Sequence, residues 1–160
     1  MDAAACKPLP RYVFRRTFDA PLDLVWAAWT EPARLAQWWG PEGFVNPRCE
    51  FEPRPDGRIH IDMTAPDGRV YPLTGRVTEI EPRRRLTFEC TALGPNGRTL
   101  FDEVNEVVFE ETADGGTAVA VYVRIVALRD AVAHRYLDMT EAGWSESLER
   151  LRSAVMRRQD

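Results

Sequence analysis

The sequence predicts an α+β fold in which a curved antiparallel sheet of six to seven strands wraps around one long C-terminal helix. Between residues 44 and 125, apolar and polar residues alternate in runs separated by turn sequences, as in antiparallel strands with one buried face. Between residues 129 and 158, apolar residues recur at helical spacing without an interrupting proline. A sheet with one apolar face must cover that face, and only this helix is long enough to do so.

Residues 1–10 include two prolines and no long apolar run, so we expect a flexible leader followed by a single domain over residues 11–158. A chain of 160 residues has the usual size of one domain with a substantial core. Neither a signal peptide nor a run of eighteen apolar residues is apparent, which predicts a cytoplasmic protein that is not inserted into a membrane. The net charge of -4 argues against a nucleic-acid partner.

The first elements are predicted to be a strand over residues 12–18 and two short helices over 21–29 and 31–39. An Ala-Pro pair ends the strand, and proline suits the first turn of a helix. Thr30 is a favourable N-cap for the second helix, which a Gly-Pro pair terminates. Four of the five tryptophans lie between residues 26 and 39, where most of their surface must be buried.

The central strands follow from alternation. Apolar residues occupy every second position from Ile59 to Met63, from Leu86 to Cys90 and from Val119 to Ile125. Asp-Gly, Gly-Gly and Pro-containing turn sequences separate these runs, and such turns join neighbouring strands of a hairpin. We therefore expect a meander of about six strands, joined by the N-terminal strand.

The C-terminal helix carries small residues in the middle of its apolar stripe, namely Thr140, Gly143 and Ser147. A glycine inside a helix costs about 1 kcal/mol relative to alanine, so it usually has a packing or functional reason. Either these residues leave a ligand-sized cavity beneath the helix, or a bulky strand side chain fills the space from the other side.

Several motifs span residues 12 to 156. They are Phe18-x-Ala20-Pro21-x3-Val25-Trp26-x-Ala28-Trp29-Thr30-x-Pro32, Leu35-x2-Trp38-Trp39-Gly40-Pro41, Gly75-Arg76-Val77, Pro82-x2-Arg85-Leu86 and Gly143-Trp144-x3-Leu148-x2-Leu151. With these motifs the sequence resembles the START-like, or SRPBCC, helix-grip superfamily. Within it, the sequence is most similar to the branch named for the activator of the heat-shock-protein-ninety ATPase. The motifs are mostly turns, caps and core residues, so they are specific for the fold and not for a function.

The resemblance implies a hydrophobic cavity between the sheet and the C-terminal helix, in which members bind lipids, sterols, polyketides or other apolar molecules. Our leading expectation is a protein that binds a small hydrophobic or amphipathic ligand without a cofactor. One alternative is a polyketide cyclase or aromatase-like enzyme that uses the same cavity. A second is a chaperone-associated or other protein-interaction module, including a homodimer formed through an exposed patch of Trp38, Trp39 and Phe44.

Candidate ligand-binding residues come from the inward strand faces, the helix stripe and the aromatic cluster. Trp38 and Trp39 are adjacent and cannot point the same way from a helix, so we expect one of them at the pocket, and we nominate the first. The full set is Trp38, Phe44, Ile61, Met63, Phe88, Cys90, Val107, Val121, Tyr136, Met139, Thr140, Gly143, Trp144 and Ser147. The polar candidates on the helix for orienting a ligand are Tyr136, Thr140 and Ser147.

Acid–base and metal chemistry have less support. His60 and Asp62 share the strand face that alternation makes the wet one. The carboxylates Glu103, Glu106, Glu110 and Glu111 crowd a later strand, and one that is forced into an apolar cavity would have a raised pKa. Cys90 is a nucleophile candidate, but a buried cysteine is usually only a small apolar side chain. Three separated cysteines and two histidines predict neither a zinc site nor a disulfide.

Overall fold

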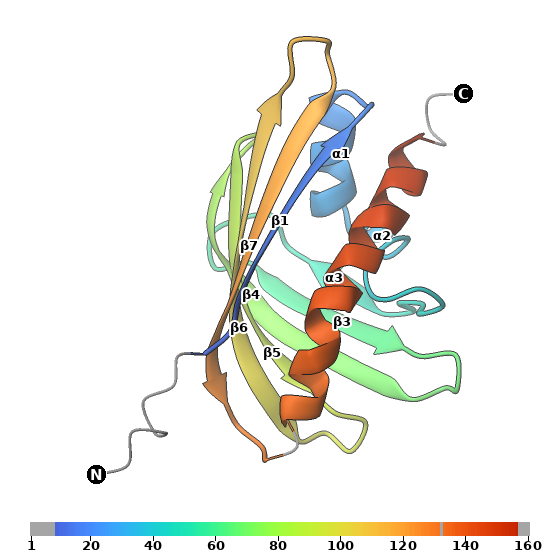
Figure 1. Ribbon diagram of the computed structural model, residues 1–160, viewed down its shortest axis with the longest axis vertical. Coiled ribbons are helices and arrows are strands. Elements are labelled where there is room, and N and C mark those ends of the chain that lie inside the picture. The colour runs from blue at the N-terminus through green and yellow to red at the C-terminus, as the bar shows by residue number, and fades with distance from the viewer. Residues whose placement is uncertain (1–8, 132, 157–160) are drawn as a thin grey trace.

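The computed structural model describes residues 9–131 and 133–156. Within these residues one antiparallel sheet has the strand order β1-β7-β6-β5-β4-β3-β2 (Figure 1). Its strands are β1 (Arg11–Phe18), β2 (Cys49–Phe51), β3 (Arg58–Thr64), β4 (Val70–Glu81), β5 (Arg85–Leu93), β6 (Thr99–Glu111) and β7 (Thr117–Leu128). The α+β prediction and the seven-stranded sheet are thus confirmed. Most of the expected leader over residues 1–10, and the end of the helix expected to reach residue 158, lie outside the described residues.

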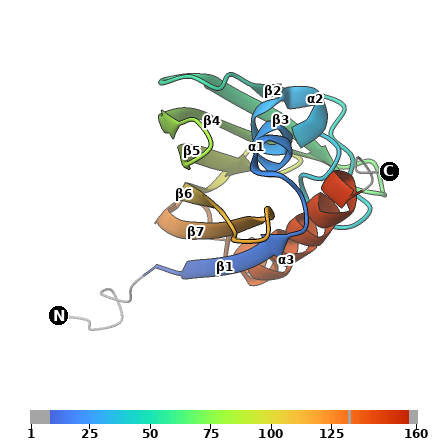
Figure 2. The same ribbon diagram turned by 90° about the horizontal axis from the view of Figure 1, so that it is seen from above.

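The sheet is strongly curved, and the three helices of the described residues lie on its concave side (Figure 2). They are α1 (Leu22–Thr30), α2 (Pro32–Leu35) and α3 (Ala133–Met156). The alternation seen in the sequence explains this arrangement, because each central strand presents its apolar residues to the same face. The long helix covers that face, as the sequence predicted.

The helix boundaries differ from the predicted ones for local reasons. Thr30 is the last residue of α1 and not an N-cap, because its hydroxyl donates back to the carbonyl of Trp26 at 2.9 Å. The second helix is only four residues long, and Glu31 is its N-cap. The long helix begins at Ala133 and not at residue 129, because the backbone N–H of Arg129 donates to the carbonyl of Leu100 and keeps this segment on the sheet.

Two clusters of buried side chains form the core, one at each end of α3. The larger one packs the C-terminal half of the helix, from Trp144 to Val155, against α1, α2 and most of the sheet. The smaller one packs Ala133 and Leu137 against the first residues of β6, Leu100 and Phe101, and against Ile125 near the end of β7. Neither cluster fills the space under the middle of α3, which is where the small residues of the helix lie.

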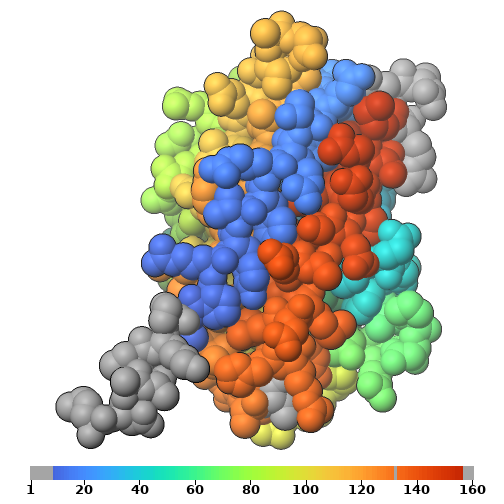
Figure 3. Space-filling model, viewed as in Figure 1, coloured from blue at the N-terminus to red at the C-terminus, as the bar shows by residue number. Residues whose placement is uncertain are grey.

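The loop over residues 36–46 crosses from α2 towards β2 and contacts α3. Arg150 holds it, because its guanidinium donates to carbonyl oxygens of Trp39, Gly40 and Pro41 at 2.9 to 3.1 Å. The same group also reaches the carbonyl of Phe44 at 3.0 Å. In the space-filling view, α3 is bordered by β1 on one side and by this loop and the β3–β4 hairpin on the other (Figure 3). The 36–46 loop is therefore tied to α3 over the middle of the sheet.

Candidate functional site

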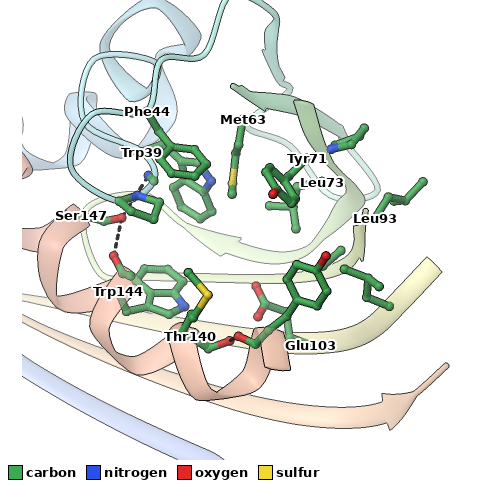
Figure 4. A pocket seen from close by; sticks show the side chains of 18 of the residues that line it. Trp39, Phe44, Met63, Tyr71, Leu73, Leu93, Glu103, Thr140, Trp144 and Ser147 are labelled. Atoms are coloured by element: carbon green, nitrogen blue, oxygen red, sulfur yellow. Dashed lines mark hydrogen bonds between the residues drawn. The ribbon is translucent and has the colours of Figure 1, made fainter. Parts of the chain in front are cut away.

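A pocket of about 210 Å³ lies between the sheet, the middle of α3 and the 36–46 loop (Figure 4). For scale, an apolar cavity of about 150 Å³ is large enough to hold benzene. The lining residues come from every one of these parts: Trp39, Gly40, Pro41, Phe44, Met63, Tyr71, Pro72, Leu73, Ala92, Leu93, Leu100, Phe101, Glu103, Tyr136, Met139, Thr140, Gly143, Trp144 and Ser147. The walls are overwhelmingly apolar.

Aromatic rings define the inner end and the outer edge of the pocket. At the inner end, Trp39 and Trp144 meet edge to face with ring centroids 5.2 Å apart. At the outer edge, Tyr71 lies between Phe44 and Tyr136, at 6.1 Å from each ring. These rings are large and stiff, so the hollow between them is shaped before any ligand arrives.

Eight of the fourteen nominated residues line this pocket: Phe44, Met63, Tyr136, Met139, Thr140, Gly143, Trp144 and Ser147. The three small helix residues are all among them. A Cβ atom added at Gly143 would lie 3.5 Å from Cγ of Pro41, so the glycine lets the loop pass close to the helix beside the pocket. Met139 is 64% exposed and therefore belongs to the mouth.

The other six nominated residues are not on the pocket wall. Ile61, Phe88, Cys90, Val107 and Val121 do face inward, but they belong to the large buried cluster, and none is more than 3% exposed. They lie where α1, α2 and the C-terminal half of α3 already fill the concave face. Inward orientation was thus predicted correctly for them, whereas contact with the pocket was not.

The choice between the adjacent tryptophans was wrong. Trp38 is fully buried, and its indole N–H donates to the carbonyl of Ala28 at 2.9 Å, which fixes it against α1. Trp39 instead lines the pocket, although it is also only 6% exposed. Because both rings are buried, the exposed tryptophan patch that we expected to support a homodimer is not present. A homodimer through another surface stays a prediction that a sizing column at two protein concentrations would test.

Of the three helix hydroxyls nominated to orient a ligand, two already form hydrogen bonds within the protein. Ser147 accepts a hydrogen bond from the backbone N–H of Gly40 at 3.0 Å and donates to the carbonyl of Gly143 at 2.9 Å. Thr140 donates to the carbonyl of Tyr136 at 3.0 Å. These two residues shape the wall and position the loop, so the pocket's chemistry must come from other groups.

Glu103 is the only carboxyl group on the pocket wall among the described residues. It is 6% exposed, and one of its oxygens, Oε1, accepts a hydrogen bond from the side-chain amide of Asn105 at 3.1 Å. Figure 4 shows its carboxylate pointing from β6 into the space near Trp144 and Leu73. Burial raises the pKa of Glu103 to about 7, against the opposing effect of the hydrogen bond from Asn105. The expectation of a titratable strand glutamate in the cavity therefore fits this residue.

The remaining acid–base candidates lie elsewhere. His60 and Asp62 form a contact of 2.9 Å with each other on β3 and do not line the pocket. Glu110 and Glu111 are exposed, and Glu106 pairs with Arg85.

Cys90 is also not a suitable nucleophile. Burial raises the pKa of its thiol well above the usual value, which disfavours the reactive thiolate. The residue borders a second hollow of about 340 Å³, whose rim carries the exposed residues Arg76 and Glu89. Polar side chains make up a larger share of its wall than of the wall of the first pocket.

The nominated ligand-binding set left out Trp39, Glu103 and several aliphatic residues of the pocket wall such as Leu73 and Ala92. A signal for two of them was present. Counting back by two from inward-facing Val107 reaches Glu103, and counting on by two from Cys90 reaches Ala92. The alternation of side chains along a strand therefore identifies the inward-facing residues, but it does not show which of them line the pocket.

Neither a metal site nor a membrane-spanning helix is found in the described part of the chain. Within residues 9–131 and 133–156, no three His, Cys, Asp or Glu side chains are grouped so that they could hold a metal ion. In the same part of the chain, no helix has the length and apolar character required to cross a bilayer.

Comparison with known proteins identifies the family. The family model described as "Activator of Hsp90 ATPase homolog 1-like protein" matches residues 19–156. A search of curated proteins finds no match. Among solved structures, a protein of Rhodobacter sphaeroides is 30% identical, with a TM-score of 0.74 over 92% of this chain and 93% of that one. Protein NE0264 of Nitrosomonas europaea (23%, TM-score 0.76, 99% of both chains) and an AHSA1 protein of Silicibacter pomeroyi (22%, TM-score 0.75, 93% and 99%) share the fold. The resemblance inferred from the motifs is confirmed: the chain belongs to the Activator of Hsp90 ATPase homolog 1-like family.

Proposed function

We propose that this protein binds a small, largely apolar molecule in the pocket between the sheet and α3. The observation that carries the proposal is the hollow itself, which two well-packed clusters leave unfilled and which apolar side chains surround. Apolar clefts and cavities with a few polar groups are the usual form of small-molecule sites. The helix-grip fold of this family commonly binds hydrophobic ligands, which agrees with the proposal.

The pocket volume limits the size of the bound part. Scaling from a 150 Å³ cavity that holds benzene, about 210 Å³ accommodates about eight or nine non-hydrogen atoms. The mouth at Met139 is open to solvent, so a longer molecule would leave its remainder outside. A single ring with a short side chain therefore fits the enclosed part.

Binding is tested by titration with propylbenzene, followed through the five tryptophan indole signals in an NMR spectrum. Trp39 and Trp144 line the pocket, so their signals should shift, whereas that of Trp38, which is hydrogen-bonded to Ala28, should stay in place. Shifts spread evenly over all five indoles, or no saturable shift, would contradict the proposal.

A matched pair of variants at one position locates the site. Gly143→Ala adds a methyl group in ordinary contact with Pro41 and should leave binding intact. Gly143→Leu adds three more carbons that must enter the pocket or displace the loop, and it should weaken propylbenzene binding by about tenfold or more. Ala92→Leu introduces bulk from the sheet side and should act in the same way. Equal affinity in the parent and both leucine variants would place the binding elsewhere.

Acid–base catalysis in the same pocket is a second candidate, and Glu103 is the specific observation that favours it. A carboxyl group whose pKa lies near neutrality is suited to transfer a proton at physiological pH. Native mass spectrometry of the freshly purified parent and of Glu103→Gln separates the two functions. A binding protein should carry in the variant no molecule that the parent lacks, whereas an enzyme should accumulate a new mass, its unconverted substrate, in the variant.

A further inference from the structure

Some polar groups beside the pocket lack hydrogen-bond partners within the described residues. Glu103 is only 6% exposed. Its only hydrogen bond among the described residues is the one that the side-chain amide of Asn105 donates to Oε1. The second carboxylate oxygen, Oε2, therefore has no donor within the part of the chain that the structure covers. Oε2 is not one of the fully buried atoms without a partner, so it is open to the pocket, where a donor from outside the chain can reach it.

The supporting amide is also incompletely satisfied. Asn105 is fully buried beside Glu103 on the inward face of β6, and its side-chain oxygen lacks a hydrogen-bond partner among the described residues. Two neighbouring polar side chains inside an apolar core lower the stability of the fold, because each buried group without a hydrogen bond loses its hydration and gains no partner. Their retention here is explained if the pair serves a ligand and not the fold.

Among the described residues, no arginine, lysine or histidine lies on the pocket wall with Glu103. The titratable groups around it are the thiol of Cys90 on β5, its register partner, and the phenols of Tyr12 on β1, Tyr71 on β4 and Tyr136 on α3. A thiol and a phenol can donate a hydrogen bond but cannot carry positive charge. The charged residues of the neighbouring turn of α3 are all exposed to solvent: His134, Arg135, Asp138 and Glu141. An ionised Glu103 is thus a buried anion without a countercharge.

From this arrangement we infer that the pocket takes a small arylalkylamine or similar apolar amine, whose ammonium group pairs with Glu103 while its ring lies between Trp144 and the apolar strand residues. The inference rests on the proposed ligand-binding function and adds the chemical class of the ligand. The ammonium group supplies both the missing donor and the missing charge, and hydrogen bonds between charged groups are the stronger kind. The apolar part fills a hollow of the size of one ring and a short chain.

Three probes of nine non-hydrogen atoms each test the inference: propylbenzene, 2-phenylethanol and 2-phenylethylamine. At pH 8 the amine should bind the parent about tenfold or more tightly than it binds Glu103→Gln, because the charged hydrogen bond is lost in the variant. The alcohol should show a smaller difference. At pH 5.5, where Glu103 is mostly protonated, propylbenzene should bind parent and variant alike.

The pH dependence provides a second readout. An alkylammonium stays protonated up to about pH 10, so only Glu103 changes its charge between pH 5.5 and pH 8 in the pocket. The affinity of the parent for 2-phenylethylamine should therefore rise about tenfold across this range, and that of Glu103→Gln should stay nearly constant. The glutamine can still accept the hydrogen bond from Asn105, and urea unfolding of the variant verifies its fold.

The outcomes separate the two proposals. If propylbenzene binds but the amine shows no preference for the parent over Glu103→Gln at pH 8, the assignment of an amine is overturned and the binding function stands. Phenylacetate that binds the parent as tightly as the amine would overturn it equally. If propylbenzene itself fails to bind at pH 5.5, both proposals fail.

Discussion

The buried carboxyl group of Glu103 makes the stability of the protein depend on pH. Burial raises its pKa from 4.5 to about 7, so the folded protein holds the proton more tightly than the unfolded chain does. The resulting stabilisation is present in full below about pH 4.5 and is lost as the pH rises through 7. A rise of this size corresponds to about 3 kcal/mol, because each pH unit is worth about 1.4 kcal/mol.

Replacing Glu103 with glutamine removes the titration and keeps the size and the acceptor for Asn105. The parent and the variant should have similar free energies of unfolding near pH 5. At pH 8 the variant should be more stable, and the difference between the two should have grown by about 2 to 3 kcal/mol.

Urea unfolding at several pH values, followed by tryptophan fluorescence, measures this difference. Glu110→Gln is the matched control, because Glu110 lies on the same strand but is exposed, and its curve should run parallel to that of the parent. If the curve of Glu103→Gln also runs parallel to the parent between pH 5 and pH 8, the carboxyl group is not buried as described.

Three further predictions follow from single hydrogen-bonding groups. Arg150→Ala removes the donors that hold the 36–46 loop and should cost about 3 kcal/mol in urea unfolding. Arg152→Ala removes one exposed bond to a carbonyl, an exposed ion pair with Glu149 and a contact with the ring of Phe18, and should cost only about 1 kcal/mol. Trp38→Phe loses the bond to Ala28 and should cost about 1 to 2 kcal/mol while propylbenzene affinity is unchanged, since the ring is off the pocket wall. Asn105→Leu removes the donor that lowers the pKa of Glu103, so the NMR titration midpoint of that carboxyl should move above about 7.

The sheet and the long helix could be predicted because their signals are local. Alternation fixes which strand residues face inward, and the buried residues of α3 from Ala133 to Val155 recur as its apolar stripe indicated. The small residues in the apolar stripe also indicated where the hollow lies, since Thr140, Gly143 and Ser147 are on its wall. In each case the side-chain period alone determines the answer.

The lining of the pocket could not be predicted in full, because it depends on how separate elements pack. Trp38 and Trp39 are equivalent in sequence, and only the shortness of α2 and the carbonyl of Ala28 decide which ring turns towards α1. The role of Ser147 was hidden for a similar reason: its partner, the N–H of Gly40, is 107 residues away. Such choices are made by tertiary contacts that no periodicity contains.

The unfilled apolar hollow beneath α3 should admit a small molecule. Crystals of the protein soaked with iodobenzene test it most directly, because iodine gives an anomalous signal that locates the ligand. We expect a single strong peak in the space bounded by Trp144, Met63 and Leu73. Soaked crystals with no iodine there, or with side chains interlocked across that space, would contradict it.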